Sequence, residues 1–326
     1  MKRRYAYLVF VLLVLSIWLG YMSYNNLWYL FSNLYGISIT MIFGSFIAGI
    51  SSEGGGAIAF PVLTLLFDVH PFDARNFSLL IQSIGMTGAS LFIYSKRIPV
   101  LNQIIPLACS IGLVGYLLGN FIIVGHIKPS AIKILFVFIW LSLAYALTKL
   151  NVRSHRSNLD LHAFNHFDWM ILVLAAFLGG VLTSLFGNGL DIIVFTCLVL
   201  YFKIDIRLAT ATSIILMSII SVFASIFNVY QEYVSETVYQ YWLVSIPFVI
   251  FGAPFGSKIM SILSPRVVTL ILISIIVVQW IGAVLIVKPT YTEIGIGLIG
   301  LVGGLVLFSF MINKGKSIIS ESGNTQ

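Results

Sequence analysis

The residues Ser51-Ser52-Glu53-Gly54-Gly55-Gly56 interrupt an apolar segment that runs from Gly36 to Phe67. Consecutive glycines remove helix propensity, and the backbone groups that they free inside a bilayer must be satisfied by protein or by water. The carboxyl group of Glu53 lies in the same interruption, and an ionisable residue at membrane depth is a candidate functional group. The stretch therefore predicts a break that serves a site.

Composition places the whole chain in a lipid bilayer. Its 326 residues are 59% hydrophobic and 9% charged, with a mean hydropathy of +1.04, whereas about a quarter of the residues in soluble domains are charged. The apolar runs are too long and too continuous for the alternating strands of a membrane β-barrel. We therefore predict an all-α polytopic membrane protein.

Charge and cysteine usage exclude other classes. The net charge of +7 needs no nucleic-acid partner, because Lys and Arg in cytoplasmic loops account for it. Cys109 and Cys197 lie inside predicted spans, so no disulfide framework is expected. No small-x-small cleavage site follows the basic and apolar start of the chain, which predicts an uncleaved first helix and not a signal peptide.

Apolar segments predict eight full spans, at 5–22, 77–94, 99–124, 131–148, 208–228, 239–262, 267–287 and 292–312. Two further segments, 36–67 and 169–202, are interrupted, the second by Phe186-Gly187-Asn188-Gly189. Pieces such as Gly36–Ile50 are shorter than the roughly 20 residues that a full crossing needs. These segments are predicted to form re-entrant or broken helices.

The two halves of the chain repeat. Similar residues recur in the second half at a constant offset of 135 positions. The residues of the first half are Gly44, Glu53, Gly54, Ala89 and Ser90, and they correspond in order to Gly179, Asn188, Gly189, Ala224 and Ser225. Gly115-x-x-x-Gly119 matches Gly252-x-x-x-Gly256, which we interpret as a pair of helix-packing motifs. Matches in the same order indicate a duplication. We predict an N-terminal segment at 1–35, repeats at 36–148 and 169–288, a linker at 149–168 and a C-terminal segment at 289–326.

Charge predicts how the repeats are oriented. If both interrupted segments return to the side from which they enter, fourteen of the eighteen Lys and Arg residues lie in the cytoplasm, with both termini. The outside then receives only Arg75, Lys128, Lys133 and Lys288. Each half has three crossings and one hairpin, so the second half is inverted. Inverted repeats with broken helices are typical of secondary transporters.

Such architecture places a substrate site between the two breaks. Half-helices that begin after Gly56 and Gly189 would point unsatisfied N–H groups at an anion. Gln82 is expected to face the first hairpin, where interhelical hydrogen bonding and ligand contact are both open. The alternative is that the glycines serve only close helix packing. The candidate substrate-binding residues are Ser51, Ser52, Gly54, Gly55, Gly56, Gln82, Gly187, Asn188 and Gly189.

Glu53 and Asp191 are the acids placed well inside membrane segments. Either residue is a candidate for proton or cation coupling, and the alternative is a neutral, hydrogen-bonded structural acid. A negative Glu53 would repel an anionic substrate unless a proton, a basic partner or a cation offsets it. Nothing in the sequence predicts a metal site, a cofactor or a catalytic constellation, so no enzyme is expected.

One stretch carries a family resemblance. The residues from Gly44 to Leu63, with Ala74-Arg-Asn-Phe-Ser78 after them, resemble the signature of the sulfite exporter TauE/SafE family, also called the toluene sulfonate uptake permease family. A more degenerate second copy is Gly187-Asn-Gly189 with Ala209-Thr-Ala-Thr-Ser213. Ser52 and Glu53 depart from the family pattern. The resemblance covers about residues 36–287 and implies a carrier of sulfur-containing anions that does not hydrolyse ATP.

These features predict a secondary transporter that moves a small anion, such as sulfite or an organosulfonate, by alternating access. A coupling ion and a homo-oligomer are both compatible with the sequence. Two alternatives stay open at this point. One is a membrane scaffold or sensor without net transport, and the other is a cation transporter that uses Glu53.

Overall fold

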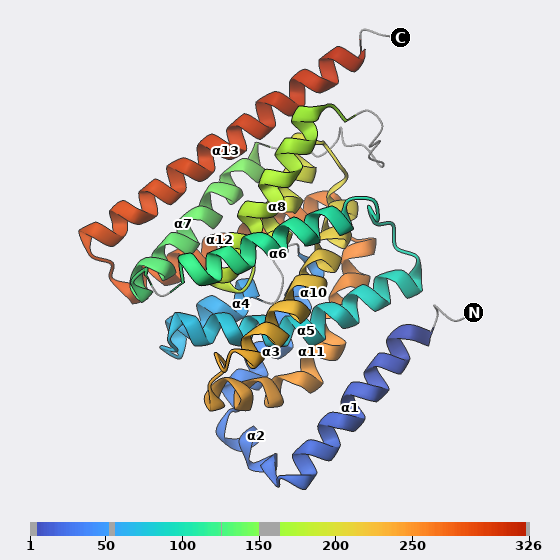
Figure 1. Cartoon of the computed structure of the whole chain (residues 1–326), viewed down its shortest axis with the longest axis vertical. Helices are drawn as coiled ribbons and strands as arrows, with labels where there is room; N and C mark the ends of the chain where they lie inside the picture. Colours follow the sequence, from blue (N-terminus) through green and yellow to red (C-terminus); the bar gives the residue numbers. More distant parts are fainter. Residues whose placement is uncertain (1–4, 52–55, 125, 150–163, 324–326) are drawn as a thin grey trace.

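The computed structural model describes residues 5–51, 56–124, 126–149 and 164–323, and the regular structure within them is helical, without strands. This confirms the predicted all-α class. Nine helices of the described residues are long and apolar enough to cross a membrane. Figure 1 shows them as one tilted bundle, with α1 at one flank and α13 at the other. They are α1 (Ala6–Tyr24), α5 (Pro71–Lys96), α6 (Ile105–Ile122), α7 (Pro129–Thr148), α8 (His166–Phe186), α10 (Ile206–Tyr230), α11 (Glu236–Ile262), α12 (Pro265–Val287) and α13 (Tyr291–Gly323).

Eight of these helices match the eight predicted spans, and the differences lie at the ends. Helix α5 begins at Pro71, six residues before the predicted start, because proline suits the first helical position and the His70 side chain accepts a hydrogen bond from the Phe72 N–H. Helix α6 begins at Ile105 and not at residue 99. The early start of α5 places Arg75 inside a helix.

The first interrupted segment folds back on itself as hairpin 1. It consists of α3 (Tyr35–Ile50), α4 (Gly56–Pro61) and the π-helical turn η3 (Val62–Leu66). A Cβ atom on Gly44 would lie 3.3 Å from Ile58, and one on Gly36 would lie 3.1 Å from the ring of Phe67. The end of the segment therefore lies beside its start, as a re-entrant hairpin requires.

The second interrupted segment forms hairpin 2, from α8, α9 (Leu190–Thr196) and the π-helical turn η5 (Cys197–Tyr201). The Tyr201 hydroxyl donates to Asp168 Oδ1 at 2.7 Å, and the rings of Phe164 and Phe202 stack at 4.7 Å. Both ends of the segment thus lie together.

The arms of hairpin 2 differ in length from the prediction. Helix α8 has 21 residues and is long enough by itself to cross a membrane, whereas short pieces were predicted. A capping box between Asn165 and Asp168 starts the helix early, and Gly187 ends it in a left-handed conformation. The ninth span-length helix is therefore one arm of a hairpin.

Helices α7 and α13 run side by side in the same direction. They therefore give an axis against which the orientation of the two hairpins can be compared. Gly297 near the start of α13 packs on Ile134 near the start of α7, and Gly304 packs on Ser142 further along. The N-termini of both helices thus lie at one end of a common axis, and both helices run toward the other end.

The bases of the two hairpins lie at opposite ends of this axis. At the start of α7, the Lys133 ammonium donates to the Thr64 carbonyl of hairpin 1 at 2.8 Å. Near the end of α13, the ring of Phe310 lies 6.4 Å from that of Phe167 at the base of hairpin 2. We call these two sides of the bundle the hairpin-1 end and the hairpin-2 end.

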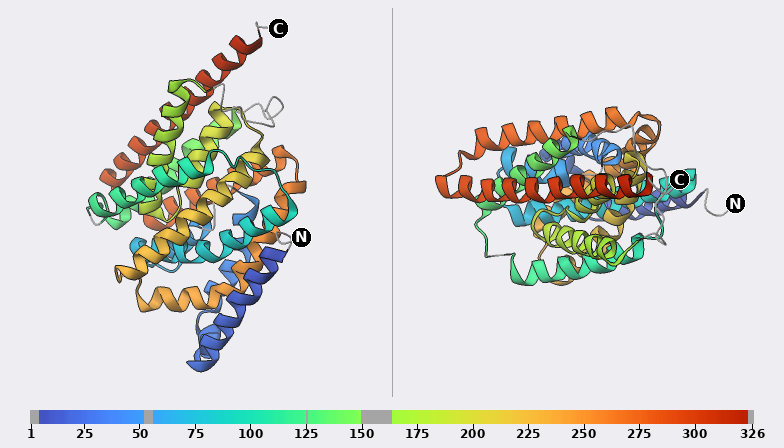
Figure 2. Two further views of the ribbon diagram at one scale, coloured as in Figure 1. Left: turned by 45° about the vertical axis from the view of Figure 1, so that its right-hand side comes forward. Right: turned by 90° about the horizontal axis from the view of Figure 1, so that it is seen from above.

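Each hairpin packs against a helix from the other half of the chain. Helix α3 lies on α11, where a Cβ on Gly256 would meet the carbonyl oxygen of Phe46. Helix α8 lies on α6, where a Cβ on Gly115 would meet the carbonyl oxygen of Phe177. These close backbone contacts are the packing role predicted for the paired glycine motifs. Figure 2 shows the same bundle from two further sides.

Candidate functional site

Part of the predicted site lies outside the described residues. Ser52, Glu53, Gly54 and Gly55 are among these positions, so their roles stay predictions. Ser51 is the buried residue that ends α3, and Gly56 begins α4. The described part of the site is therefore the tip of hairpin 2 and the surfaces that it contacts.

The tips of the two hairpins meet through aromatic side chains. The ring of Phe60 in α4 lies 5.8 Å from that of Phe186, the last residue of α8. Phe136 and Trp140 of α7 stack on each other at 4.6 Å and contact the same ring of Phe186. The fold thus brings both interrupted segments together, and an apolar wall closes one side of their junction.

Gln82 contacts the tip of hairpin 2, near the middle of α5. Its Nε2 group donates to the Gly187 carbonyl at 2.8 Å and to the Ser78 hydroxyl at 2.8 Å. The side chain is 1% exposed, and its Oε1 atom has no partner among the described residues. Gln82 was expected to face the first hairpin, and these contacts place its amide on the second.

Gly187 must be glycine for two reasons. Its φ angle is +80°, which L side chains rarely adopt, and a Cβ atom would lie 2.7 Å from the carbonyl oxygen of Arg75. The tip of hairpin 2 therefore rests directly on the backbone of α5.

Asp191 is fully buried just inside the start of α9. Its Oδ1 atom accepts a hydrogen bond from the Gly189 N–H at 3.0 Å, while Oδ2 has no partner among the described residues. The Leu190 N–H donates to the Thr183 hydroxyl at 3.0 Å. In this conformation these two amides after the break are satisfied by the chain's own side chains, and they do not point free N–H groups at a ligand as the sequence predicted.

Asn188 lies between these residues and is fully buried at the tip of hairpin 2. With Gly187 and Gly189 it forms the turn that joins α8 to α9. The three residues that the sequence assigned to the second break are thus adjacent to Gln82 and to Asp191, and they form one polar centre inside the bundle.

Arg75 is the functional candidate that the sequence did not reveal. It was counted with the outside loops, but it lies in α5 with 1% of its surface exposed. Its Nη1 atom donates to Asn120 Oδ1 at 2.8 Å and to the Ser184 carbonyl at 2.9 Å, and its Nη2 atom donates to Asn76 Oδ1 at 2.8 Å. The guanidinium also lies 4.4 Å from the ring centre of Phe72.

Neutral groups continue this network. The Asn76 amide donates to the Tyr233 carbonyl at 2.6 Å, and the Asn228 amide donates to Asn76 Oδ1 at 3.0 Å. The Tyr116 hydroxyl donates to Asn228 Oδ1 at 2.8 Å. We call this set the Arg75 cluster; its side chains are those of Arg75, Asn76, Tyr116, Asn120 and Asn228.

The charge of Arg75 has no acidic partner among the described residues. The ion pairs between described side chains are Lys133 with Asp68 and Arg207 with Asp205. Neither pair involves the cluster. A buried cation that hydrogen-bonds only to neutral acceptors is electrostatically suited to receive an anion.

A signal for Arg75 does exist in the sequence. The segment Ala74-Arg75-Asn76-Phe77-Ser78 corresponds to Ala209-Thr210-Ala211-Thr212-Ser213 at the offset of 135. Every residue of both segments is buried. A charged arginine and an asparagine in one buried segment therefore stand against a threonine and an alanine in the other.

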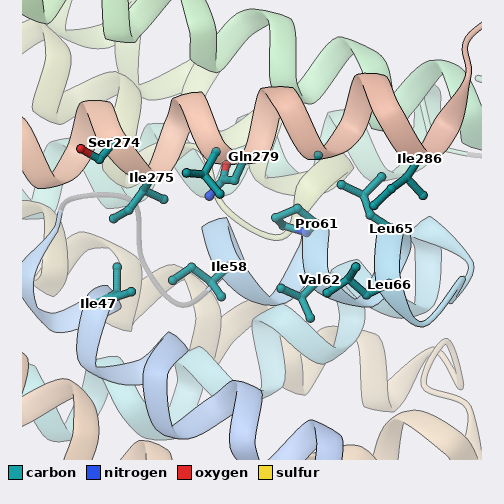
Figure 3. A pocket seen from close by; sticks show the side chains of 12 residues that line it. Ile47, Ile58, Pro61, Val62, Leu65, Leu66, Ser274, Ile275, Gln279 and Ile286 are labelled. Atoms are coloured by element: carbon teal, nitrogen blue, oxygen red, sulfur yellow. The ribbon is translucent and has the colours of Figure 1, made fainter.

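Among the cavities that the described residues form outside this centre, two differ clearly in chemistry. An apolar groove of about 440 Å³ separates hairpin 1 from α12, and Figure 3 shows Ile58 and Pro61 lining it opposite Ile275. A basic pocket of about 470 Å³ lies at the hairpin-2 end, where Lys96, Arg97 and Arg207 surround it. The first suits hydrocarbon, and the second presents positive charge on the side predicted to face the cytoplasm.

Comparison with known proteins agrees with the resemblance seen in the sequence. A family model described as sulfite exporter TauE/SafE matches residues 37–285. The match contains both hairpins and the Arg75 cluster, and it leaves α1 and α13 outside. No curated protein and no solved structure matches the chain.

Proposed function

Because the chain belongs to the sulfite exporter TauE/SafE family, a family of membrane transporters, we propose that it is a secondary carrier of a small sulfur-containing anion. Sulfite and organosulfonates are the proposed substrates. The proposed location is the cell (inner) membrane, with both termini in the cytoplasm. The nine span-length helices among the described residues make it a multi-pass membrane protein.

One observation carries this proposal: two re-entrant hairpins enter the bundle from opposite ends and meet at their tips. The contact between Phe60 and Phe186 joins the tips, while Lys133 and Phe310 mark the opposite bases. Broken helices that meet inside a membrane bundle are typical of substrate sites in secondary transporters. The proposed substrate site lies beside this junction, at Gln82 and Gly187.

We propose alternating access between two inverted repeats as the mechanism. Each hairpin packs on a helix of the other half through glycines, so the two halves contact each other across smooth backbone surfaces. Such surfaces allow one half to shift against the other without breaking interlocked side chains. The shift would open the junction of the hairpin tips first to one end of the bundle and then to the other.

The direct test is anion flux in liposomes. Purified protein is reconstituted into vesicles loaded with sulfite or with an alkyl sulfonate, and release is followed over time. We expect release faster than from protein-free vesicles, with saturation at high substrate concentration. Folded, monodisperse protein that releases no sulfur anion above the protein-free rate would overturn the proposal.

We propose Asp191 as the residue that carries a coupling proton. A fully buried carboxyl group with one unpartnered oxygen is costly in its charged form, so it gains from a proton. In Asp191→Asn the amide keeps an acceptor for the Gly189 N–H but cannot exchange a proton. Flux in the wild type should respond to a pH gradient, and flux in Asp191→Asn should not.

The control for this variant is Asp68→Asn, whose side chain is almost fully exposed at the base of hairpin 1. It should respond to the gradient as the wild type does. An unchanged pH response in Asp191→Asn would assign proton coupling elsewhere, and Glu53 is then the next candidate.

A further inference from the structure

We infer that Arg75 is an oxyanion-binding residue of the transport path, and that an anion bound to its guanidinium releases the tip of hairpin 2 from α5 and α6. The inference rests on the proposed function, since it assigns the sulfur anion to a particular group. It adds a binding residue and a link between binding and movement.

The first step is the charge of the cluster. Arg75 is 1% exposed, and its acceptors are two asparagine oxygens and one backbone carbonyl. Removing an ion from water costs several kcal/mol of desolvation free energy even after the protein relaxes. Hydrogen bonds to neutral acceptors offset only part of this free energy. An anion therefore gains more binding free energy at this guanidinium than at an arginine that already has an acidic partner.

The second step is the fit of the ligand. A guanidinium presents parallel N–H groups that match two oxygens of a planar or tetrahedral oxyanion, and such charge-assisted hydrogen bonds are about twice as strong as neutral ones. Sulfite and sulfonates carry oxygens in this arrangement. The ring of Phe72 covers one face of the guanidinium, so the ligand must bind at the N–H edge, where it meets the present acceptors of Arg75.

The third step links binding to movement. The acceptors of Arg75 come from three elements: Asn76 from α5, Asn120 from α6 and the Ser184 carbonyl from α8. Without an anion, the guanidinium holds the tip of hairpin 2 against α5 and α6. An oxyanion competes with Asn120 and Ser184 for Nη1, so its binding favours states in which the tip has moved away.

Within the described residues the second half has no counterpart of the Arg75 cluster. The positions that correspond to Arg75 and Asn76 in the second half are Thr210 and Ala211, and Ser257 corresponds to Asn120. These residues are buried, and none of them carries a charge. One oxyanion per chain is therefore expected at this type of site, near the hairpin-1 end.

The sharpest test is Asn120→Asp, because it places a permanent carboxylate 2.8 Å from Arg75 Nη1 with almost no change of shape. The built-in anion should raise the melting temperature of the purified protein in anion-free buffer. It should also remove the stabilisation that added sulfite gives to the wild type. Arg75→Gln should lose the same stabilisation, with anion binding weakened by about tenfold to a hundredfold.

Controls separate local from general effects. Asn25→Asp adds a carboxylate in an exposed position, and Arg266→Gln removes an exposed cation. Both should keep the response of the wild type. Sulfite, sulfate, thiosulfate and chloride are compared, so that anion binding is measured independently of sulfur-anion flux.

The outcomes distinguish the two proposals. If the wild type transports sulfite and Asn120→Asp still gains full stabilisation from the anion, Arg75 is not the binding residue while the transport function stands. If no anion in the panel stabilises the wild type, the inference is also overturned. If anions stabilise the wild type through Arg75 but no sulfur anion is transported, the site stands and the proposed function fails.

Discussion

Single residues hold the tip of hairpin 2 in place, and Gln82 is one of them, through its hydrogen bond to the Gly187 carbonyl. Replacing Gln82 by Leu leaves the Gly187 carbonyl without the donor that lies 2.8 Å away. The Ser78 hydroxyl, 3.4 Å away, is then its remaining side-chain donor, and a poorly paired buried acceptor costs up to about 1–3 kcal/mol. We expect a loss of stability of that size in thermal unfolding, together with a lower apparent affinity in the flux assay.

Ser83→Ala is the matched control for Gln82→Leu. Ser83 is the next residue of α5, and its hydroxyl donates only within the helix, to the Leu80 carbonyl. It should leave stability and flux almost unchanged. Equal effects of the two substitutions would mean that the contact with Gly187 has no special role.

At this scale the sequence predicted some residues and missed others for a physical reason. The hairpin contact of Gln82 was predicted because an unpaired amide is costly in a membrane, although the partner proved to be the second hairpin. Arg75 was missed because the rule for basic residues counts them in loops. Its partners Asn120 and Ser184 lie 45 and 109 positions away, and no local pattern reveals such contacts.

At the scale of elements, a hydrogen bond between Tyr201 and Asp168 joins the two arms at the base of hairpin 2. In Tyr201→Phe the Asp168 carboxylate loses the hydroxyl that lies 2.7 Å away. Hydrogen bonds to charged groups contribute about 1.5–3 kcal/mol. We expect hydrogen exchange in α9 and η5 to rise by a factor that corresponds to this free energy, while exchange in α10 stays as in the wild type.

Tyr24→Phe provides the control, because Tyr24 is the strongly exposed last residue of α1. It should leave exchange in hairpin 2 unchanged. Faster exchange throughout the bundle in Tyr201→Phe would show a global loss of stability and would contradict a local clamp.

The elements themselves were predictable because apolar length decides a membrane helix. Their ends were not, because caps and turns decide them. Helix α5 starts at a proline after His70, and α8 starts at a capping box, and neither signal is apolar. The predicted span at 77–94 therefore omitted the first turns of α5, which carry Arg75 and Asn76.

For the whole molecule, the opposite entry of the hairpins makes a prediction about membrane sides. Single cysteines are placed at Asp68, at the base of hairpin 1, and at His166, at the base of hairpin 2, in a background with Cys109 and Cys197 replaced by Ala. A membrane-impermeant maleimide should label Asp68→Cys in intact cells. It should label His166→Cys only after the membrane is opened.

Both original cysteines are buried, so they should react little with the maleimide. Replacing them leaves the introduced cysteine as the thiol that is labelled. Labelling of both sites from the same side would contradict inverted repeats. At this scale the duplication stays a prediction, made because small residues recur at a constant offset. The contact between the hairpin tips was not predictable, because it joins aromatic residues of separate halves, Phe60 and Phe186.

The returning arm of each hairpin ends in a π-helical turn, and η3 and η5 lie at the same offset of 135 as the repeats. A π-helical turn stores one extra residue relative to an α-helix. Passing that residue along an arm rotates the adjoining part by about 100° and advances it by about 1.5 Å. A shift of the extra residue along an arm would therefore change the neighbours of the side chains at the tip of that hairpin.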